Sequence, residues 1–286
     1  MRQNIETFIA CDAAYEDAKV VIFGAPFDST TSYRPGARFG SAAIRHESYG
    51  LETYSPYLDR DLEDINVYDA GDLELPMGSA EKALNDISTM TAEILDDGKL
   101  PLMMGGEHLV TLGALREVLQ RYPDVHIIHF DAHADLRDQY LDVRLSHACV
   151  MRRCHDLIGD GRIHQFGIRS GERAEFDFAR AGHTDFHPFT FDGLDGVVAE
   201  LASSQVPVYF SIDLDVLDPS VFPGTGTPEA GGVSFDELRK ALTKVCQQLN
   251  IVAMDVTELA PTLDPSGVST AVAGKVVREL LLAINQ

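Results

Sequence analysis

Basic residues are scarce in this 286-residue sequence. Its 23 lysines and arginines face 45 aspartates and glutamates, which gives a formal net charge of −22. Nucleic acid and anionic membrane surfaces would repel such a chain, so we exclude both as partners. A small cationic substrate would be attracted to it, although acidity of this degree also serves solubility alone.

Long apolar runs and paired cysteines are missing as well. No stretch of 18 apolar residues occurs, and the N-terminus lacks a basic flank followed by an apolar segment. We therefore expect a cytoplasmic protein without a membrane span. The four cysteines, Cys11, Cys149, Cys154 and Cys246, show no CxxC spacing, which favours buried or free thiols over a disulfide framework.

Short apolar runs alternate with segments of helical periodicity along the whole chain. The runs that predict buried strands cover 19–26, 66–71, 100–106, 125–132, 162–169, 206–215 and 250–259. The helical segments cover 79–98, 107–122, 234–250 and 267–285. This alternation predicts one α/β domain over 1–286, built on a mostly parallel sheet with helices on both faces. Ser79 and Ser234 are expected to be N-caps, and Gly98 suits a helix end.

Carboxylates follow two of the predicted strands at a spacing of two. Asp131, His133 and Asp135 come after the run at 125–130, and Asp213 and Asp215 end the run at 206–215. If the chain stays extended there, side chains two apart share a face. One such strand end alone could be a hydrated polar terminus. Two of them would gather like charges at a cost of several kcal/mol unless cations neutralise them, which predicts a metal pair.

A third strand end supplies one more candidate ligand. His108 follows the Gly-Gly turn after 100–104, at the predicted start of a helix. A single histidine in that position is more often structural, but its place at the carboxyl end of a strand favours a ligand. Oxygen donors with one or two imidazoles suit a hard or borderline divalent ion, with Mn²⁺ foremost among catalytic candidates.

These motifs together resemble the ureohydrolases, the arginase and agmatinase family, and within it the agmatinase branch most closely. The matching segments are GAPFDSTTSYRPGARFGSAAIR at 24–45, GGEH at 105–108, FDAHAD at 130–135, SHA at 146–148, SIDLDVLDP at 211–219, PGTGTPEAGG at 223–232 and DVTELAP at 255–261. The resemblance implies a three-layer αβα sandwich around an eight-stranded, mostly parallel sheet, usually assembled as trimers or hexamers.

The resemblance also implies roles for single residues. Two Mn²⁺ ions per chain would be held, one by His108, Asp131, Asp135 and Asp213, the other by Asp131, His133, Asp213 and Asp215. Asp135 would carry a proton to the leaving nitrogen, His147 would shuttle protons at the mouth of the site, and Glu258 would clamp the guanidinium. Without the resemblance, we would interpret His147 as a surface histidine at a helix start and Glu258 as a solvated acid. Glu107 and Leu109 replace the aspartate and serine that the family has more often.

The implied reaction is hydrolysis of agmatine to putrescine and urea, a step of polyamine biosynthesis. The segment 136–145 resembles the agmatinase version, with Asp138, Asp142 or a backbone carbonyl available to the cationic tail. Arg137 and Arg144 could instead serve guanidinobutyrate or formiminoglutamate, or form surface ion pairs, and arginine is a further alternative substrate. Two more distant alternatives are a single-zinc deacetylase and a metal-binding protein without activity.

Overall fold

Eight parallel strands form the central sheet of the structure, a computed structural model that describes residues 6–284. Their order is β4-β1-β5-β10-β9-β6-β7-β8. The strands are β1 (Val20–Ala25), β4 (Val67–Asp72), β5 (Leu100–Gly105), β6 (His126–Phe130), β7 (Ile163–Ile168), β8 (Asp185–Pro188), β9 (Pro207–Asp213) and β10 (Asn250–Thr257). A separate antiparallel pair joins β2 (Tyr54–Ser55) to β3 (Arg60–Asp61).

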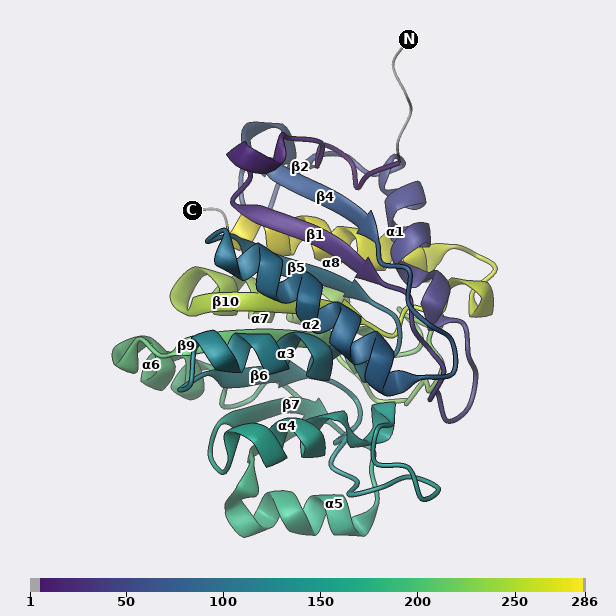
Figure 1. The fold of residues 1–286 in the computed structure, drawn as a ribbon, viewed down its shortest axis with the longest axis vertical. Coiled ribbons are helices and arrows are strands. Elements are labelled where there is room, and N and C mark those ends of the chain that lie inside the picture. Colours follow the sequence, from purple (N-terminus) through teal and green to yellow (C-terminus); the bar gives the residue numbers. More distant parts are fainter. Residues whose placement is uncertain (1–5, 285–286) are drawn as a thin grey trace.

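Helices cover both faces of the sheet (Figure 1). One layer holds α2 (Ala80–Asp96), α3 (Val110–Arg121) and α4 (Val150–Ile158), and the other holds α1 (Gly40–Ser48), α6 (Leu194–Ser204), α7 (Phe235–Gln248) and α8 (Val268–Ile284). The short α5 (Arg173–Phe178) follows β7. Single turns are η1 (Tyr15–Asp17), η2 (Ala37–Phe39), η3 (Leu62–Asp64), η4 (His147–Cys149), η6 (Leu214–Val216) and η7 (Pro261–Leu263), with a π-turn η5 at Ala179–His183. Within residues 6–284 no helix is long and apolar enough to cross a membrane.

Each buried strand contributes to two hydrophobic cores, one on each face of the sheet. In β1, Val20 and Ile22 pack with the layer of α7 and α8, whereas Val21 and Phe23 pack with the layer of α2 and α3. Successive strand residues point to opposite faces, so a strand covered on both sides must be apolar throughout. This explains the continuous apolar runs of the sequence.

The structure confirms the αβα sandwich with its eight-stranded parallel sheet. Seven strands and four helices lie where the sequence predicts them. The sequence prediction missed β8, the short pair β2 and β3, and the helices α1, α4, α5 and α6. Ser234 forms the expected capping box with Glu237, whereas Ser79 occupies its N-cap position without a side-chain hydrogen bond. Gly98 has a φ of 71° just beyond α2, as a helix end requires.

Strand order brings the candidate site residues together. The strands β5, β10, β9 and β6 are consecutive neighbours in the middle of the sheet. Because they are parallel, their carboxyl ends share one edge, and the segments that follow them converge there. His108, Glu258, Asp213 and Asp131 are thereby placed side by side.

Candidate functional site

The chain turns sharply where the two acidic strand ends finish. The Asp131 Oδ1 atom accepts a hydrogen bond from the amide of His133 at 2.6 Å, and the Asp213 Oδ1 atom accepts one from the amide of Asp215 at 2.9 Å. The expected extended continuation is therefore wrong, because each leading aspartate closes a turn onto the residue two positions later. Asp135 has a φ of 53°, which also lies outside an extended strand.

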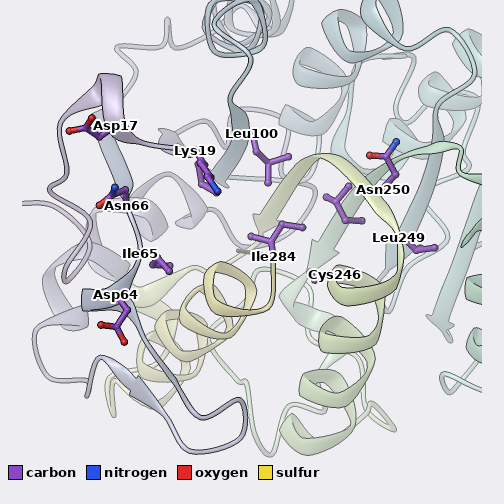
Figure 2. A pocket seen from close by; sticks show the side chains of 12 residues that line it. Asp17, Lys19, Asp64, Ile65, Asn66, Leu100, Cys246, Leu249, Asn250 and Ile284 are labelled. Atoms are coloured by element: carbon purple, nitrogen blue, oxygen red, sulfur yellow. The ribbon is translucent and has the colours of Figure 1, made fainter. Parts of the chain in front are cut away.

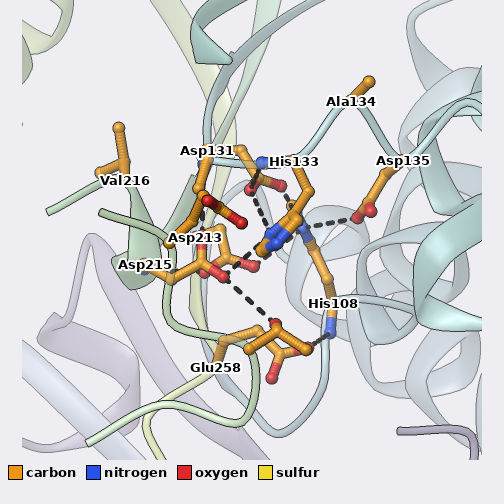
Figure 3. Close-up of polar contacts among 12 residues, drawn as sticks. His108, Asp131, His133, Ala134, Asp135, Asp213, Asp215, Val216 and Glu258 are labelled. Carbon is orange, nitrogen blue, oxygen red and sulfur yellow. Dashed lines mark hydrogen bonds and ion pairs between the residues drawn. The ribbon is translucent and has the colours of Figure 1, made fainter. Parts of the chain in front are cut away.

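A first cluster surrounds the imidazole of His108 (Figure 3). The His108 Nδ1 atom lies 3.1 Å from Asp131 Oδ2, and 3.3 Å from both Asp135 Oδ2 and Asp213 Oδ2. All four side chains are at least nine-tenths buried. These are the residues that the family resemblance implies for one ion.

A second cluster shares Asp131 with the first. The His133 Nδ1 atom lies 3.0 Å from Asp215 Oδ2 and 3.5 Å from Asp131 Oδ1. Asp131 therefore faces His108 through Oδ2 and His133 through Oδ1. Asp213 faces the first cluster through Oδ2, while its Oδ1 atom is engaged by the Asp215 amide. His108 follows β5, Asp131, His133 and Asp135 follow β6, and Asp213 ends β9 with Asp215 following it. Figure 3 shows these side chains converging.

A hydrogen-bond relay orients His108. The Ser211 hydroxyl donates its proton to Asp255 Oδ1 at 2.7 Å, so its oxygen accepts from the Nε2–H of His108 at 2.9 Å. In the neutral ring the lone pair is therefore on Nδ1, where it faces three carboxylates. Lone pair and carboxylates repel one another unless a cation lies between them, and metal-binding histidines commonly donate their second N–H in this way. The donor set thus fits a divalent cation.

The electrostatics of the two clusters also call for positive charge. Burial, together with the charges of Asp215 and Asp131, raises the pKa of Asp213 well above its usual range. Burial opposes a charge on His108 and His133, but the surrounding carboxylates raise the pKa of both imidazoles well above the ordinary value. Cations between the imidazoles and the carboxylates would replace the protons on these groups and relieve the repulsion among the carboxylates.

His129 belongs to the same cluster, and the sequence interpretation missed it. Its Nδ1 atom accepts from the side-chain Nε2 of Gln165 at 3.1 Å, so its Nε2–H donates to Asp131 Oδ2 at 2.8 Å. His108, His129 and Asp131 form one potential metal-binding group and Asp131, His133 and Asp215 another. His129 stands two positions before Asp131, directly ahead of the FDAHAD motif, so its spacing was the signal available.

Glu258 and His147 lie beside the clusters, near the start of α3. The Glu258 Oε1 atom accepts from the His108 amide at 2.9 Å and lies 3.3 Å from His147 Nδ1. Its Oε2 atom is buried and has no hydrogen-bond partner among the described residues. Burial opposes a charge on His147, but Glu258, Asp135 and Glu107 together raise its pKa to about 9.

The two departures from the commoner family motif have different surroundings. Leu109 is fully buried in the core on the α2 and α3 side of the sheet. Glu107 is fully buried as well, and its carboxylate accepts hydrogen bonds from Thr30 and Thr31. Burial raises the pKa of Glu107 to about 7, against the hydrogen bonds from Thr30.

A cavity of about 250 Å³ opens onto the clusters. Its walls include Asp135, His147, Arg137, Tyr140 and Glu175. Asp138 pairs with Arg153 and is more than half exposed, and Arg144 forms surface ion pairs with Asp156 and Asp138. Asp138, Asp142 and Arg144 are absent from the lining of this cavity, whereas Arg137 is part of it.

A larger cavity, of about 510 Å³, lies at the opposite edge of the sheet (Figure 2). It is formed by residues at the amino ends of strands, such as Lys19, Leu100 and Asn250. Among its described lining residues there is no histidine. The candidate chemistry is therefore concentrated at the carboxyl edge.

Comparison with known proteins gives a consistent result over nearly the whole chain. The sequence model of the arginase family matches residues 18–283. The agmatinase of Bacillus cereus is 46% identical over 279 residues, which are 97% of this chain and 96% of that protein. The N(1)-aminopropylagmatine ureohydrolase of Thermococcus kodakarensis is 38% identical over 263 residues, covering 90% of this chain and 88% of that protein.

A solved structure agrees with these sequence matches. The agmatine ureohydrolase of Thermoplasma volcanium superposes with a TM-score of 0.90 at 32% identity, covering 99% of this chain and 95% of that one. The family model and the long alignments at these identities leave one assignment. This chain belongs to the arginase family.

Proposed function

We propose that this chain is a binuclear manganese hydrolase that cleaves agmatine to putrescine and urea, and so serves polyamine biosynthesis. One observation carries the proposal: two imidazole–carboxylate clusters share Asp131 and lie beside Glu258, whose buried Oε2 atom has no hydrogen-bond partner within residues 6–284. The relatives whose names give agmatine or aminopropylagmatine as substrate support this choice.

The proposed metal ligands are the six clustered side chains. His108, Asp131, Asp135 and Asp213 would hold one ion, and Asp131, His133, Asp213 and Asp215 the other. Carboxylates and imidazoles without a thiolate suit Mn²⁺ better than a structural zinc site. When bound, two such ions supply Lewis acidity and lower the pKa of a water for attack on the guanidinium carbon.

Glu258 is placed to orient the guanidinium. A planar cation with paired N–H donors fits the two oxygens of a carboxylate. The Oε2 atom of Glu258 is free to accept N–H groups of the substrate, whereas Oε1 already accepts from the His108 amide and faces His147 Nδ1. Burial of this carboxylate strengthens its attraction for the substrate, since little solvent competes.

Two further residues would handle protons. An amine is a poor leaving group, so a proton must reach its nitrogen as the bond breaks. Asp135 lies in the first cluster and lines the cavity, which suits it to deliver that proton. His147, with Glu258 on one side and the cavity on the other, would exchange protons with solvent at the mouth.

The cavity favours a cationic tail over a carboxylate. Arg137 is the arginine in its wall, and its guanidinium is hydrogen-bonded to Glu172 at 2.6 Å and stacked on Tyr140. Its charge is therefore already compensated. Glu175, which is buried beside it, adds negative charge to the same wall. These contacts support agmatine over guanidinobutyrate and formiminoglutamate.

The test is a substrate panel with Mn²⁺-loaded protein. Urea release would be measured from agmatine, N1-aminopropylagmatine, arginine and guanidinobutyrate, and formiminoglutamate hydrolysis would be followed in parallel. We expect agmatine to have the highest kcat/KM. A preference for arginine, or no urea from any substrate, would reject the proposal.

We also propose that the chain assembles as a trimer or hexamer, which sedimentation velocity would test.

A further inference from the structure

The loop that follows β1 is docked on the turn that precedes His108. The Glu107 amide donates to the Phe27 carbonyl at 2.7 Å. A Cβ atom at position 106 would lie 2.0 Å from the same carbonyl oxygen, so this close approach requires Gly106. The chain from Phe27 onward therefore lies directly against the metal-cluster turn.

The Glu107 carboxylate holds the middle of this loop. Its Oε2 atom accepts from the Thr30 amide at 2.9 Å and from the Thr31 hydroxyl at 3.0 Å. Its Oε1 atom accepts from the Thr30 hydroxyl at 2.5 Å. A carboxylate has only acceptors, so these three bonds fix the direction of each donor.

The loop in turn holds His147 at two points. The Thr30 hydroxyl donates its hydrogen bond to Glu107, so its oxygen is left to accept from the His147 amide at 3.0 Å. The Ser32 amide donates to His147 Nε2 at 3.0 Å, and the Ser32 hydroxyl lies 2.9 Å from the same nitrogen. Both the backbone and the ring of His147 are thus attached to residues 30–32.

When His147 is neutral, the Ser32 amide determines which ring nitrogen carries the proton. A backbone N–H can only donate, so it requires a lone pair on Nε2. The proton of the neutral ring is then on Nδ1, which faces Glu258 Oε1 at 3.3 Å. We propose that Glu107 is a positioning residue, which clamps residues 30–32 so that Ser32 keeps His147 in its Nδ1–H form, directed at Glu258.

This inference rests on the proposed function, in which His147 exchanges protons at the mouth, and it adds a residue that sets the ring's starting state. A ring free to rotate would lose both the Glu258 contact and the defined lone pair. The Glu107 side chain reaches the loop with both carboxylate oxygens, Oε1 at Thr30 and Oε2 at Thr30 and Thr31.

The test compares Glu107→Ala and Thr30→Val with Thr91→Val as control. Thr30→Val keeps the volume and Glu107 but removes the hydroxyl that joins Glu107 to His147. Thr91 is also a buried threonine, but its hydroxyl donates to the Ile87 carbonyl within α2 and does not contact the loop. Hydrogen exchange of peptides covering 28–34 and the kcat and KM for agmatine would be measured on Mn²⁺-loaded protein.

We expect faster exchange at 28–34 in both variants and a decrease in kcat of about 10- to 100-fold, as for other residues that orient a catalytic group, with KM changed less than about threefold. The control should match the wild type in both measurements. Wild-type exchange and kcat in Thr30→Val would overturn the clamp, even if Glu107→Ala fails to fold. If the wild type releases no urea, the proposed function fails, while hydrogen exchange still decides whether Glu107 holds the loop.

Discussion

The Nε2 atom of His108 lies 2.9 Å from the hydroxyl oxygen of Ser211, and this hydroxyl donates a hydrogen bond to Asp255. Asp255 is fully buried and also accepts hydrogen bonds from Thr111 and Tyr209. The relay therefore fixes the ring of His108 with its Nδ1 lone pair toward the carboxylates. It lies entirely within the central strands and α3, away from solvent.

Ser211→Ala would remove the acceptor for the His108 Nε2–H. We expect the affinity for Mn²⁺ to fall about 10- to 100-fold, as for other residues that orient metal-binding histidines. Isothermal titration calorimetry with Mn²⁺ would measure this affinity. Ser88→Ala is the matched control, because Ser88 is a buried serine that donates to the Gly113 carbonyl and not to a residue of the clusters. Equal affinity in the two variants would contradict the role of the relay.

Glu258→Gln tests the guanidinium clamp. The substitution keeps the volume but removes the charge, and a charged hydrogen bond contributes about 1.5 to 3 kcal/mol. We therefore expect kcat/KM for agmatine to fall at least about 10-fold, with bound Mn²⁺ unchanged. Steady-state kinetics with metal analysis would show it. Loss of metal instead of substrate affinity would place Glu258 among the ligands and contradict the clamp.

His126 makes stability depend on pH at the amino edge of the sheet. Burial, followed by the charges of His164 and Arg162, lowers the pKa of His126 from 6.5 to about 4, against the pull of Asp124. The unfolded chain thus binds this proton at a higher pH than the folded chain does. The free energy of unfolding should fall as the pH drops from about 6.5 towards 4, because protons then favour the unfolded state.

His126→Asn removes this contribution. Urea unfolding at pH 7 and pH 4.5 should show a smaller loss of stability in the variant than in the wild type. His46→Asn is the control. Hydrogen bonding to Glu6 raises the pKa of this exposed imidazole, so its contribution has the opposite sign, being present at low pH and lost as the pH rises. An equal loss in His126→Asn and the wild type would contradict the account.

Two serines at helix starts offer a matched test of capping. Ser234 accepts from the Glu237 amide, whereas Ser79 makes no cap hydrogen bond. We expect Ser234→Ala to lower the free energy of unfolding by about 1 kcal/mol, and Ser79→Ala to have a clearly smaller effect. Urea denaturation of the two variants measures the difference. The reverse order would show that the capping box does not stabilise α7.

The sheet was predictable because its central strands are apolar on both faces, and the long amphipathic helices because their periodicity is continuous. The strand β8 has only four residues, Asp185–Pro188, and carries an aspartate, a histidine and a proline. Such a segment has no pattern of its own. Its pairing with β7 is set by the tertiary fold.

The carboxylate and histidine motifs could be recognised because each lies within a few residues of sequence. Their geometry could not, because the turns closed by Asp131 and Asp213 replace the extended conformation expected from spacing alone. The supporting residues were also out of reach. Ser211 contacts His108 from 103 positions away in the chain, and Ser32 contacts His147 from 115 positions away. Asp255 supports Ser211 from 44 positions away. No local pattern records such contacts.

The central claim, a two-ion site that hydrolyses agmatine, is tested most directly by measuring metal content and urea release on the same preparation. We expect about two Mn²⁺ ions per chain and urea from agmatine in the wild type, as for binuclear hydrolases. Asp131→Asn should lose bound metal and activity together. One zinc ion per chain would favour a deacetylase, and two metals without turnover a binding protein. Full activity in Asp131→Asn would contradict the shared ligand.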